Sequence, residues 1–242
     1  MSPDVLPDSQ GHSMAAAWSL SLEQADRLRP AGLARPMLRL AAFLDAGGTP
    51  AAALLTTPVL GHLAAHRPAG SAPSGRGGAV AAEDAMGALR ALHRLSLLDV
   101  SEGAGRQGAS VRVHQIVQRA TRDNLSPALY GETARAAADG LVAAWPDVER
   151  DTALAQAFRA CASALASFAE AAGCLYRPDA HPVLFRAGTS PGESGQVVAA
   201  VRHCEELSAR ARHHLGADHP SALTARHNLA HWRARAAEEP LP

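Results

Sequence analysis

The chain has 242 residues, with 23 basic and 23 acidic side chains and a formal net charge of zero. Hydrophobic residues make up 47% but aromatic residues only 4%, and alanine, the strongest helix former, dominates the apolar residues. This composition favours an all-helical fold, and the neutral charge excludes a strong electrostatic attraction to nucleic acid or to an anionic membrane.

The cysteines and the first residues of the chain indicate a cytoplasmic protein. Cys161, Cys174 and Cys204 are odd in number and widely spaced, whereas a secreted disulfide framework is denser and even in count. Residues Met1–Gly11 lack the basic and apolar regions of a secretory signal. No segment reaches the roughly 18 uncharged apolar residues of a membrane helix. We therefore interpret the cysteines as reduced core residues and expect no membrane partner.

The first part of the chain predicts short helices that follow a disordered lead-in over residues 1–13. In these segments apolar residues return every three or four positions, as on one face of a helix, and proline and glycine separate the segments. The expected helices cover residues 14–28, 34–44, 50–55, 58–66 and 83–96, with a flexible loop over 67–79.

The helical spacing of apolar residues ends after the fifth of these helices. Residues 97–100 and 111–113 are strand candidates joined by a glycine-rich loop, which is a hairpin pattern, and residues 114–125 return to a helix. Helices, a hairpin and a closing helix follow one another in a winged-helix domain. The sequence therefore predicts a winged-helix-like domain over residues 14–125.

From residue 126 onward the pattern is helical without strands. Connecting helices are expected over 126–175, a loop rich in proline and glycine over 176–195, and a helical hairpin over 196–237. The clearest amphipathic stripe repeats at alternating spacings of four and three residues, and consists of Leu154, Phe158, Cys161, Leu165, Phe168 and Ala172.

The segment LGADHPSALTARHNLAHWRARA, residues 215–236, carries a specific turn followed by a helix. It resembles tetratricopeptide repeats of the kinesin-light-chain type found in bacterial signalling proteins, which have a Leu-Gly-x-Asp-His-Pro-x-x-Leu turn and then Arg-x-Asn-Leu-Ala. The matching residues are Leu215, Gly216, Asp218, His219, Pro220, Leu223, Arg226, Asn228, Leu229 and Ala230. The resemblance covers one turn and its second helix, and it implies a helical pair that binds a protein or peptide.

This resemblance supplies the candidate protein-interaction residues, which are Leu223, Arg226, Asn228, Leu229 and Trp232. Repeats of this kind bury their apolar faces only by stacking on neighbours. We therefore expect an apolar strip around Leu229 and Trp232 to stay partly uncovered, unless the middle helices cover it. An uncovered strip predicts partner binding or self-association.

The N-terminal half begins with AAAWSLSLEQADRL and resembles the region after the nucleotide-binding core of NB-ARC (STAND-class) regulators. In those proteins a Trp-x-Leu-Ser-Leu helix precedes a winged helix. Residues 88–100 and 111–125 look like the later helix, the wing and the closing helix of that domain. Together the two resemblances imply the C-terminal part of an actinobacterial-type regulator: a winged-helix-like domain with a small β-hairpin, followed by antiparallel tetratricopeptide-like helical pairs.

The chain departs from this family in having no lysine. The phosphate-binding loop Gly-x-x-x-x-Gly-Lys-Ser/Thr needs a lysine ammonium at the terminal phosphates, so this sequence cannot contain that loop. We expect no cofactor, and we expect a nucleotide-binding domain to be a partner in trans. His114 is a weak candidate for the ADP-sensing histidine of such regulators, and a local hydrogen bond at a helix start is its alternative reading.

Other motifs give little support for a chemical site. Gly103, Gly105 and Gly108 match Gly-x-Gly-x-x-Gly, but a strand follows them, so a wing tip is the better reading than a dinucleotide loop. The pairs His62/His66 and His227/His231 have zinc-binding spacing, yet no further ligand lies nearby in sequence. We predict no metal, no catalytic residue and no enzyme.

The predicted function is a non-catalytic, regulatory protein–protein interaction module. One alternative is a transcriptional regulator that binds DNA through the winged helix, with Arg90, Arg94, Arg106 and Arg112 as candidate contacts. Few arginines are offered for phosphate neutralisation, so a nucleic-acid partner is the weaker expectation. A second alternative is a degenerate fragment without retained function.

Overall fold

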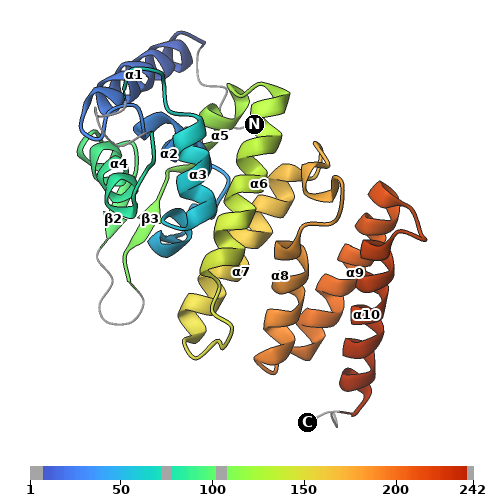
Figure 1. Cartoon of the computed structure of the whole chain (residues 1–242). Helices are drawn as coiled ribbons and strands as arrows, with labels where there is room; N and C mark the ends of the chain where they lie inside the picture. The colour runs from blue at the N-terminus through green and yellow to red at the C-terminus, as the bar shows by residue number, and fades with distance from the viewer. Residues whose placement is uncertain (1–7, 72–77, 102–107, 239–242) are drawn as a thin grey trace, which may run out of the picture.

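The computed structural model describes residues 8–71, 78–101 and 108–238, with side chains from Trp18 onward. Within these ranges the chain forms ten α-helices, two 3-10 turns and three short strands (Figure 1). The prediction of a mainly α fold is confirmed. Among the described helices, none combines the length and the apolarity needed to cross a bilayer.

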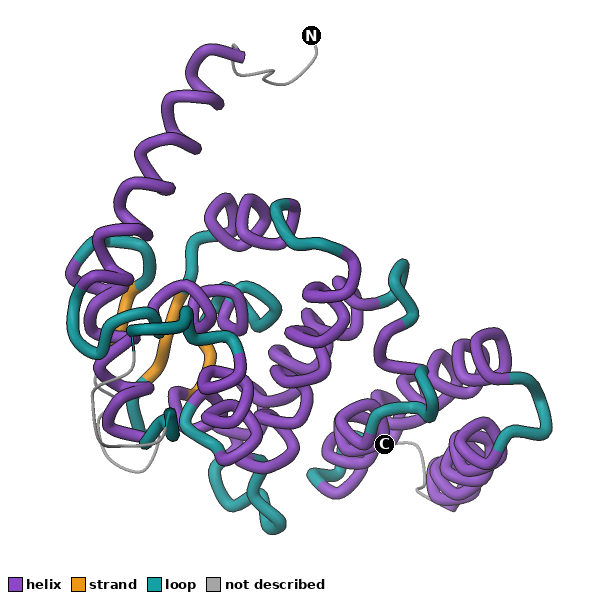
Figure 2. Tube along the Cα trace, turned by 45° about the horizontal axis from the view of Figure 1, so that its top comes forward, coloured by secondary structure: helices purple, strands orange, loops and turns teal. Residues whose placement is uncertain are grey.

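The N-terminal body contains five helices, one 3-10 turn and a small sheet. Helix α1 begins at Asp8, earlier than the expected start at Met14, and Figure 2 shows its first turns extending away from the body. The predicted disordered lead-in over 1–13 is therefore wrong for residues 8–13, and residues 1–7 lie outside the described ranges. Extending an existing helix costs little once its first turn has formed. The helices are α1 (Asp8–Arg27), α2 (Ala34–Ala41), α3 (Thr57–Ala65), α4 (Ala82–Arg94) and α5 (Gln115–Asp123), with η1 at Ala51–Leu54.

The sheet has three antiparallel strands in the order β1-β3-β2. The predicted hairpin is present as β2 (Asp99–Ser101) and β3 (Ser110–Arg112). Strand β1 (Thr49–Pro50) was not expected, because a Thr-Pro pair is also a typical helix start. Thr49 lies opposite Val111 of β3, and the Ala51 N–H donates to the Ala109 carbonyl at 2.8 Å. This pairing is a long-range contact that local patterns do not reveal.

One apolar core runs from the N-terminal body into the helices that follow it. Helix α6 (Pro127–Ala144) packs on α3, η1 and α2. Gly140 permits this approach, because a Cβ there would lie 2.6 Å from both the Ala53 carbonyl oxygen and Val59 Cγ2. The first of the expected connecting helices therefore belongs to the core of the N-terminal body.

The later helices pack one after another along the chain (Figure 1). They are α6, α7 (Thr152–Ala169), α8 (Pro182–Glu193), α9 (Val197–Leu215) and α10 (Pro220–Glu238), with η3 at Cys174–Tyr176. The predicted stripe on α7 is buried at Phe158, Cys161 and Leu165. Its last expected member, Ala172, is exposed beyond the end of the helix.

Helix α8 corrects the predicted loop over residues 176–195. Two glycines and one proline of this segment lie in the packed part of the helix. A Cβ on Gly188 would lie 2.6 Å from His203 Cδ2, and a Cβ on Gly192 would lie 2.3 Å from Trp232 Cη2. Pro191 is buried inside the last turn of α8. Glycine and proline are typical of loops, so the composition of this segment favours a loop. Its glycines are needed instead because residues of α9 and α10 pack closely against α8, and these residues are distant in sequence.

Candidate protein-interaction site

Helices α8 and α10 begin in the same way. His181 precedes Pro182 at the start of α8, and its Nδ1 accepts a hydrogen bond from the Val183 N–H at 3.2 Å. His219 precedes Pro220 at the start of α10, and its Nδ1 accepts from the Ser221 N–H, also at 3.2 Å. Each histidine thus satisfies one of the backbone donors that a helix start leaves without a partner. The second start was recognised in the sequence, and the first was not.

Both capping histidines also face an aspartate. His181 Nε2 lies 3.0 Å from Asp139 Oδ1 on α6, and His219 Nε2 lies 3.5 Å from Asp179 Oδ1 before α8. The His181 side chain is 2% exposed and the His219 side chain 24%. Burial lowers the pKa of His181, and the hydrogen bond with Asp139 acts in the opposite direction. The two contacts fix the start of each helix to an element that precedes it.

The predicted interaction residues divide between two faces of α10. Trp232 is only 4% exposed and packs in a small apolar cluster with Val197, Ala200 and Cys204 of α9. Leu229 is partly buried against the same cluster. The middle helices α8 and α9 thus cover the strip at Trp232 and half-cover it at Leu229, which is the exception that the sequence-based expectation allowed.

The opposite face of α10 carries a different strip, which we call the α10 strip. Its members recur at alternating spacings of four and three residues and are all exposed: Leu223, His227, Ala230, Ala234 and Ala237. Leu223 is 39% exposed, and the predicted residue Arg226 is exposed beside it, whereas Asn228 is half-buried. Four of the five side chains in the strip are apolar, and three are alanines that allow another helix to approach closely.

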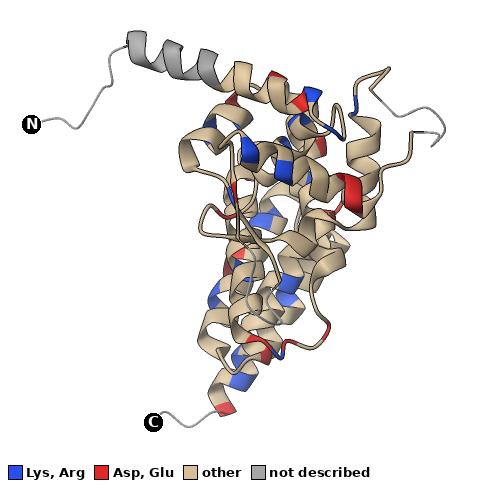
Figure 3. Cartoon of the chain, turned by 90° about the vertical axis from the view of Figure 1, so that its left-hand side faces the viewer, with Lys and Arg blue, Asp and Glu red and all other residues tan. Residues whose placement is uncertain are grey.

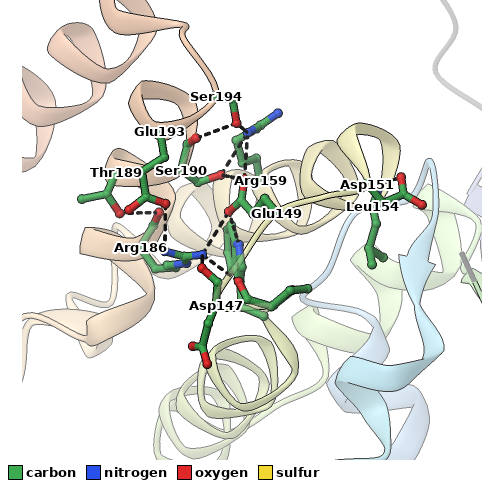
Figure 4. A network of polar contacts seen from close by, with 12 residues as sticks. Asp147, Glu149, Asp151, Leu154, Arg159, Arg186, Thr189, Ser190, Glu193 and Ser194 are labelled. Carbon is green, nitrogen blue, oxygen red and sulfur yellow. Dashed lines mark hydrogen bonds and ion pairs between the residues drawn. The ribbon is translucent and has the colours of Figure 1, made fainter. Parts of the chain in front are cut away.

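A buried polar network joins α7 and α8 to the turn between α6 and α7 (Figure 4). Its centre is Glu149, which lies in that turn. Its carboxylate is 5% exposed and accepts hydrogen bonds from Trp145 Nε1 at 2.7 Å and Ser190 Oγ at 2.8 Å. Arg186 Nη2 and Arg159 Nη1 lie 3.3 and 3.5 Å from it. The network ties the α6–α7 turn to α8.

No local signal in the sequence marks Glu149 as the centre of a network. Its partners come from the end of α6, from α7 and from α8, so the network exists only after these helices pack. Arg186 also pairs with Glu193 at 3.2 Å. Two arginines and two glutamates leave the network without net charge, and its role is to hold helices together.

A small polar pocket of about 370 Å³ lies between α7, α8 and α9. The polar residues of its lining are Arg159, Ser163, Arg202, His203 and Glu206. His203 Nε2 donates to the Leu184 carbonyl at 2.8 Å, and burial lowers the pKa of this histidine. The lining contains no large apolar side chain, so this pocket does not suit an apolar helix as the α10 strip does.

Three of the four candidate DNA contacts lie in the described part of the chain, and all three are exposed. Arg90 and Arg94 are exposed on α4, and Arg112 is exposed on β3, where its Nε donates to the Gly47 carbonyl at 2.8 Å. Arg106 lies outside the described residues. Figure 3 shows acidic and basic residues interspersed along this side of the molecule.

The structure places His114 as a helix cap. It is exposed at the start of α5, where its Nδ1 accepts from the Ile116 N–H at 3.3 Å. This is the alternative reading that the sequence left open for His114, and nothing in this geometry points to a nucleotide.

The rings of His62 and His66 on α3 stack with centroids 4.1 Å apart. His66 Nε2 lies 3.3 Å from Glu132 Oε2, while His62 Nε2 is buried without a partner in the described part of the chain. Burial, followed by the charge of His66, lowers the pKa of His62 to about 4. Across the described ranges, no group of three or more His, Cys, Asp or Glu side chains is arranged to hold a metal ion.

The three cysteines are free thiols, as expected for reduced core residues. Cys161 and Cys204 are buried and Cys174 is half-buried. Burial raises the pKa of the Cys204 thiol to about 11, which keeps it protonated and unreactive at neutral pH.

No protein-family model matches the chain, and no match exists among the curated proteins or the solved structures. The two family resemblances therefore stay predictions. A functional assignment depends on the arrangement of helices and exposed side chains described above.

Proposed function

We propose that the chain is a non-catalytic, regulatory interaction module whose α10 strip binds a helical segment of a partner protein. The observation that carries the proposal is the exposed strip itself. Leu223, Ala230 and Ala234 lie along one line of α10, the last helix of a series packed in sequence. Burial of apolar surface stabilises an association by about 25 cal/mol per Å² of area removed from water.

The packing of the preceding helices supports a helix as the partner. Helix α8 packs between α7 and α9, and α10 packs on α9. In repeat proteins each helical pair buries its face against the next one, and the α10 strip has the spacing of such a face. The repeated His-Pro starts of α8 and α10 agree with the tetratricopeptide resemblance.

The N-terminal body supports a regulatory role of the STAND type. Its order is α2, β1, α3, α4, β2, β3, and the first strand pairs with the third. A helix, a strand, two helices and a hairpin in this order, with that pairing, are what a winged-helix-like domain would have, and they support this part of the proposal. A nucleotide-binding domain in trans is the partner that this resemblance favours.

The described residues give less support to DNA binding. Arg112 directs its Nε to Gly47, and Glu83 and Asp84 lie in the first turn of the same helix that carries Arg90 and Arg94. Since affinity for DNA grows with the number of phosphates neutralised, this region offers too few free cations.

The test is a capture experiment from the source cells with three forms of the chain. Ala230→Arg places a charge in the middle of the α10 strip, and Ala209→Arg places the same charge at an exposed site on α9. We expect a protein that is retained by the wild type and by Ala209→Arg to be lost with Ala230→Arg. Equal capture by all three forms, or no retained protein, would overturn the proposal.

A further inference from the structure

A second pocket lies in the N-terminal body, between α1, α2 and α5, far along the chain from the α10 strip. Its volume is about 350 Å³, within the usual range of sites for small molecules. Its apolar walls are formed by Trp18, Leu22, Leu38, Leu97, Val117 and Leu125. The remaining lining is polar and includes two arginines of α2, Arg35 and Arg39.

The two arginines have different surroundings. Arg35 is compensated by Asp26, whose carboxylate accepts hydrogen bonds from the Arg35 backbone N–H at 2.8 Å and from its Nε at 3.1 Å. Arg39 is half-buried and has no hydrogen-bond or ion-pair partner among the residues that the structure describes. Burial, followed by the charge of Arg35, lowers the pKa of Arg39. The pocket thus contains one half-buried cation without a bonded counter-ion.

Two further polar side chains in the lining direct their donors elsewhere. Thr121 Oγ1 donates to the Val117 carbonyl at 2.7 Å, and Asn124 Nδ2 donates to the Ala120 carbonyl at 2.7 Å. The Arg35 guanidinium is bonded to Asp26 through Nε, so Arg39 is the arginine of the pocket whose whole guanidinium is left for a ligand. A charge-assisted hydrogen bond between a guanidinium and a carboxylate is about twice as strong as a neutral one.

We propose that this pocket binds a small monocarboxylate with an apolar body. The carboxylate pairs with Arg39, and the apolar body lies against Trp18, Leu38 and Val117. A neutral apolar molecule would leave Arg39 without a bonded counter-ion, since Asp26 acts on it only from a distance, and a cation would be repelled by both arginines. This site is separate from the protein-binding strip, and it makes the N-terminal body a sensor of a small organic acid.

The site also links α1 to the body. Trp18 and Leu22 come from α1, while Arg39 comes from α2 and Val117 from α5. A ligand that contacts all three helices would hold the end of α1 in place. Binding should therefore change the fluorescence of Trp18.

The proposal is tested by calorimetric titration of the full chain with sodium octanoate, 1-octanol and octylamine, which share an apolar tail and differ in charge. We expect octanoate to bind, octanol to bind at least tenfold more weakly and octylamine not to bind. Arg39→Gln should weaken octanoate binding at least tenfold without lowering the thermal midpoint, because it removes a half-buried charge that has no bonded counter-ion. Arg90→Gln, at an exposed site on α4, should leave it unchanged.

Three results would overturn the proposal. They are no heat of binding with octanoate, equal affinity for octanoate and octanol, and an octanoate affinity that Arg39→Gln changes less than twofold. The comparison of the three ligands uses the wild-type chain alone, so it decides the matter even if the variant does not fold. A Trp18→Phe form should bind octanoate with a reduced fluorescence response.

Discussion

The indole ring of Trp232 on α10 lies directly against Gly192 on α8. The approach is so close that a Cβ on residue 192 would lie 2.3 Å from Cη2 of the ring. Trp232 is 4% exposed in this position. Helices α8 and α10 both pack on α9, and this contact joins them directly to each other. It is possible because residue 192 has no side chain.

Gly192→Ala should therefore destabilise the chain, although alanine is the better helix former. The added methyl group must displace the indole ring, and overpacking of this kind costs about 1–3 kcal/mol. The free energy of unfolding in urea measures the effect. The matched control is Gly61→Ala on α3, where nothing lies within 4 Å of the added Cβ. We expect the control to be neutral or to stabilise by up to about 1 kcal/mol, and equal effects would contradict the packing account.

Glu149→Gln should be among the more damaging single substitutions in the C-terminal half. It leaves Arg159 and Arg186 facing a neutral group in a largely buried network. Loss of one partner from a buried ion pair costs about 3 kcal/mol. Glu193→Gln is the control, because Glu193 is 49% exposed and a surface pair contributes about 1 kcal/mol or less. If urea unfolding shows equal losses, the network does not hold the α6–α7 turn to α8.

The two capping histidines should differ in their contribution to stability. His181→Ala removes a cap and the partner of Asp139 from a site that is 2% exposed, whereas His219 is 24% exposed. Loss of a helix cap costs about 1 kcal/mol, and loss of the buried hydrogen bond adds about 1 kcal/mol. Thermal unfolding should show a larger decrease for His181→Ala than for His219→Ala. The reverse order would contradict the assignment.

The chain should lose stability as the pH falls from 6.5 towards 4, partly because of His62. In the folded state burial lowers the pKa of His62 to about 4, against an ordinary value of 6.5. Between these values the unfolded chain binds a proton that the folded chain does not, so the free energy of unfolding falls with falling pH. Below about 4 the contribution of His62 is fully lost.

His62→Gln should reduce the acid-induced loss in this window, because it removes the titrating group. His227→Gln, at an exposed position on α10, should leave the slope unchanged. The measurement is the urea midpoint at several pH values between 7 and 4. An unaltered slope for His62→Gln would show that the buried imidazole does not titrate as described.

Local spacing was enough to predict most of the helices and the β2–β3 hairpin. The α7 stripe of Phe158, Cys161 and Leu165 is buried as expected because three- and four-residue spacing defines one face of a helix whatever its neighbours are. Strand β1 was missed because only its long-range pairing with β3 makes Thr49–Pro50 a strand. Helix propensity and turn patterns do not carry that information.

The exposed residues of the proposed interaction site could be predicted only in part, for a related reason. The sequence placed Leu223 and Arg226 on the correct helix, and both are exposed. It also predicts an uncovered strip at Trp232 unless the middle helices cover it, and α9 together with Gly192 of α8 does cover it. Gly188 and Gly192 weaken the helix signal of α8 and at the same time allow α9 and α10 to approach it. Residues that permit close packing can thus hide the helix that they serve.

The most direct test of the central claim is photo-crosslinking in the source cells from a benzoylphenylalanine at position 230, on the α10 strip. The same group at position 209, exposed on α9, is the control. The account predicts a discrete adduct with a partner protein from position 230 and not from position 209. No adduct from position 230, or the same adducts from both positions, would contradict it.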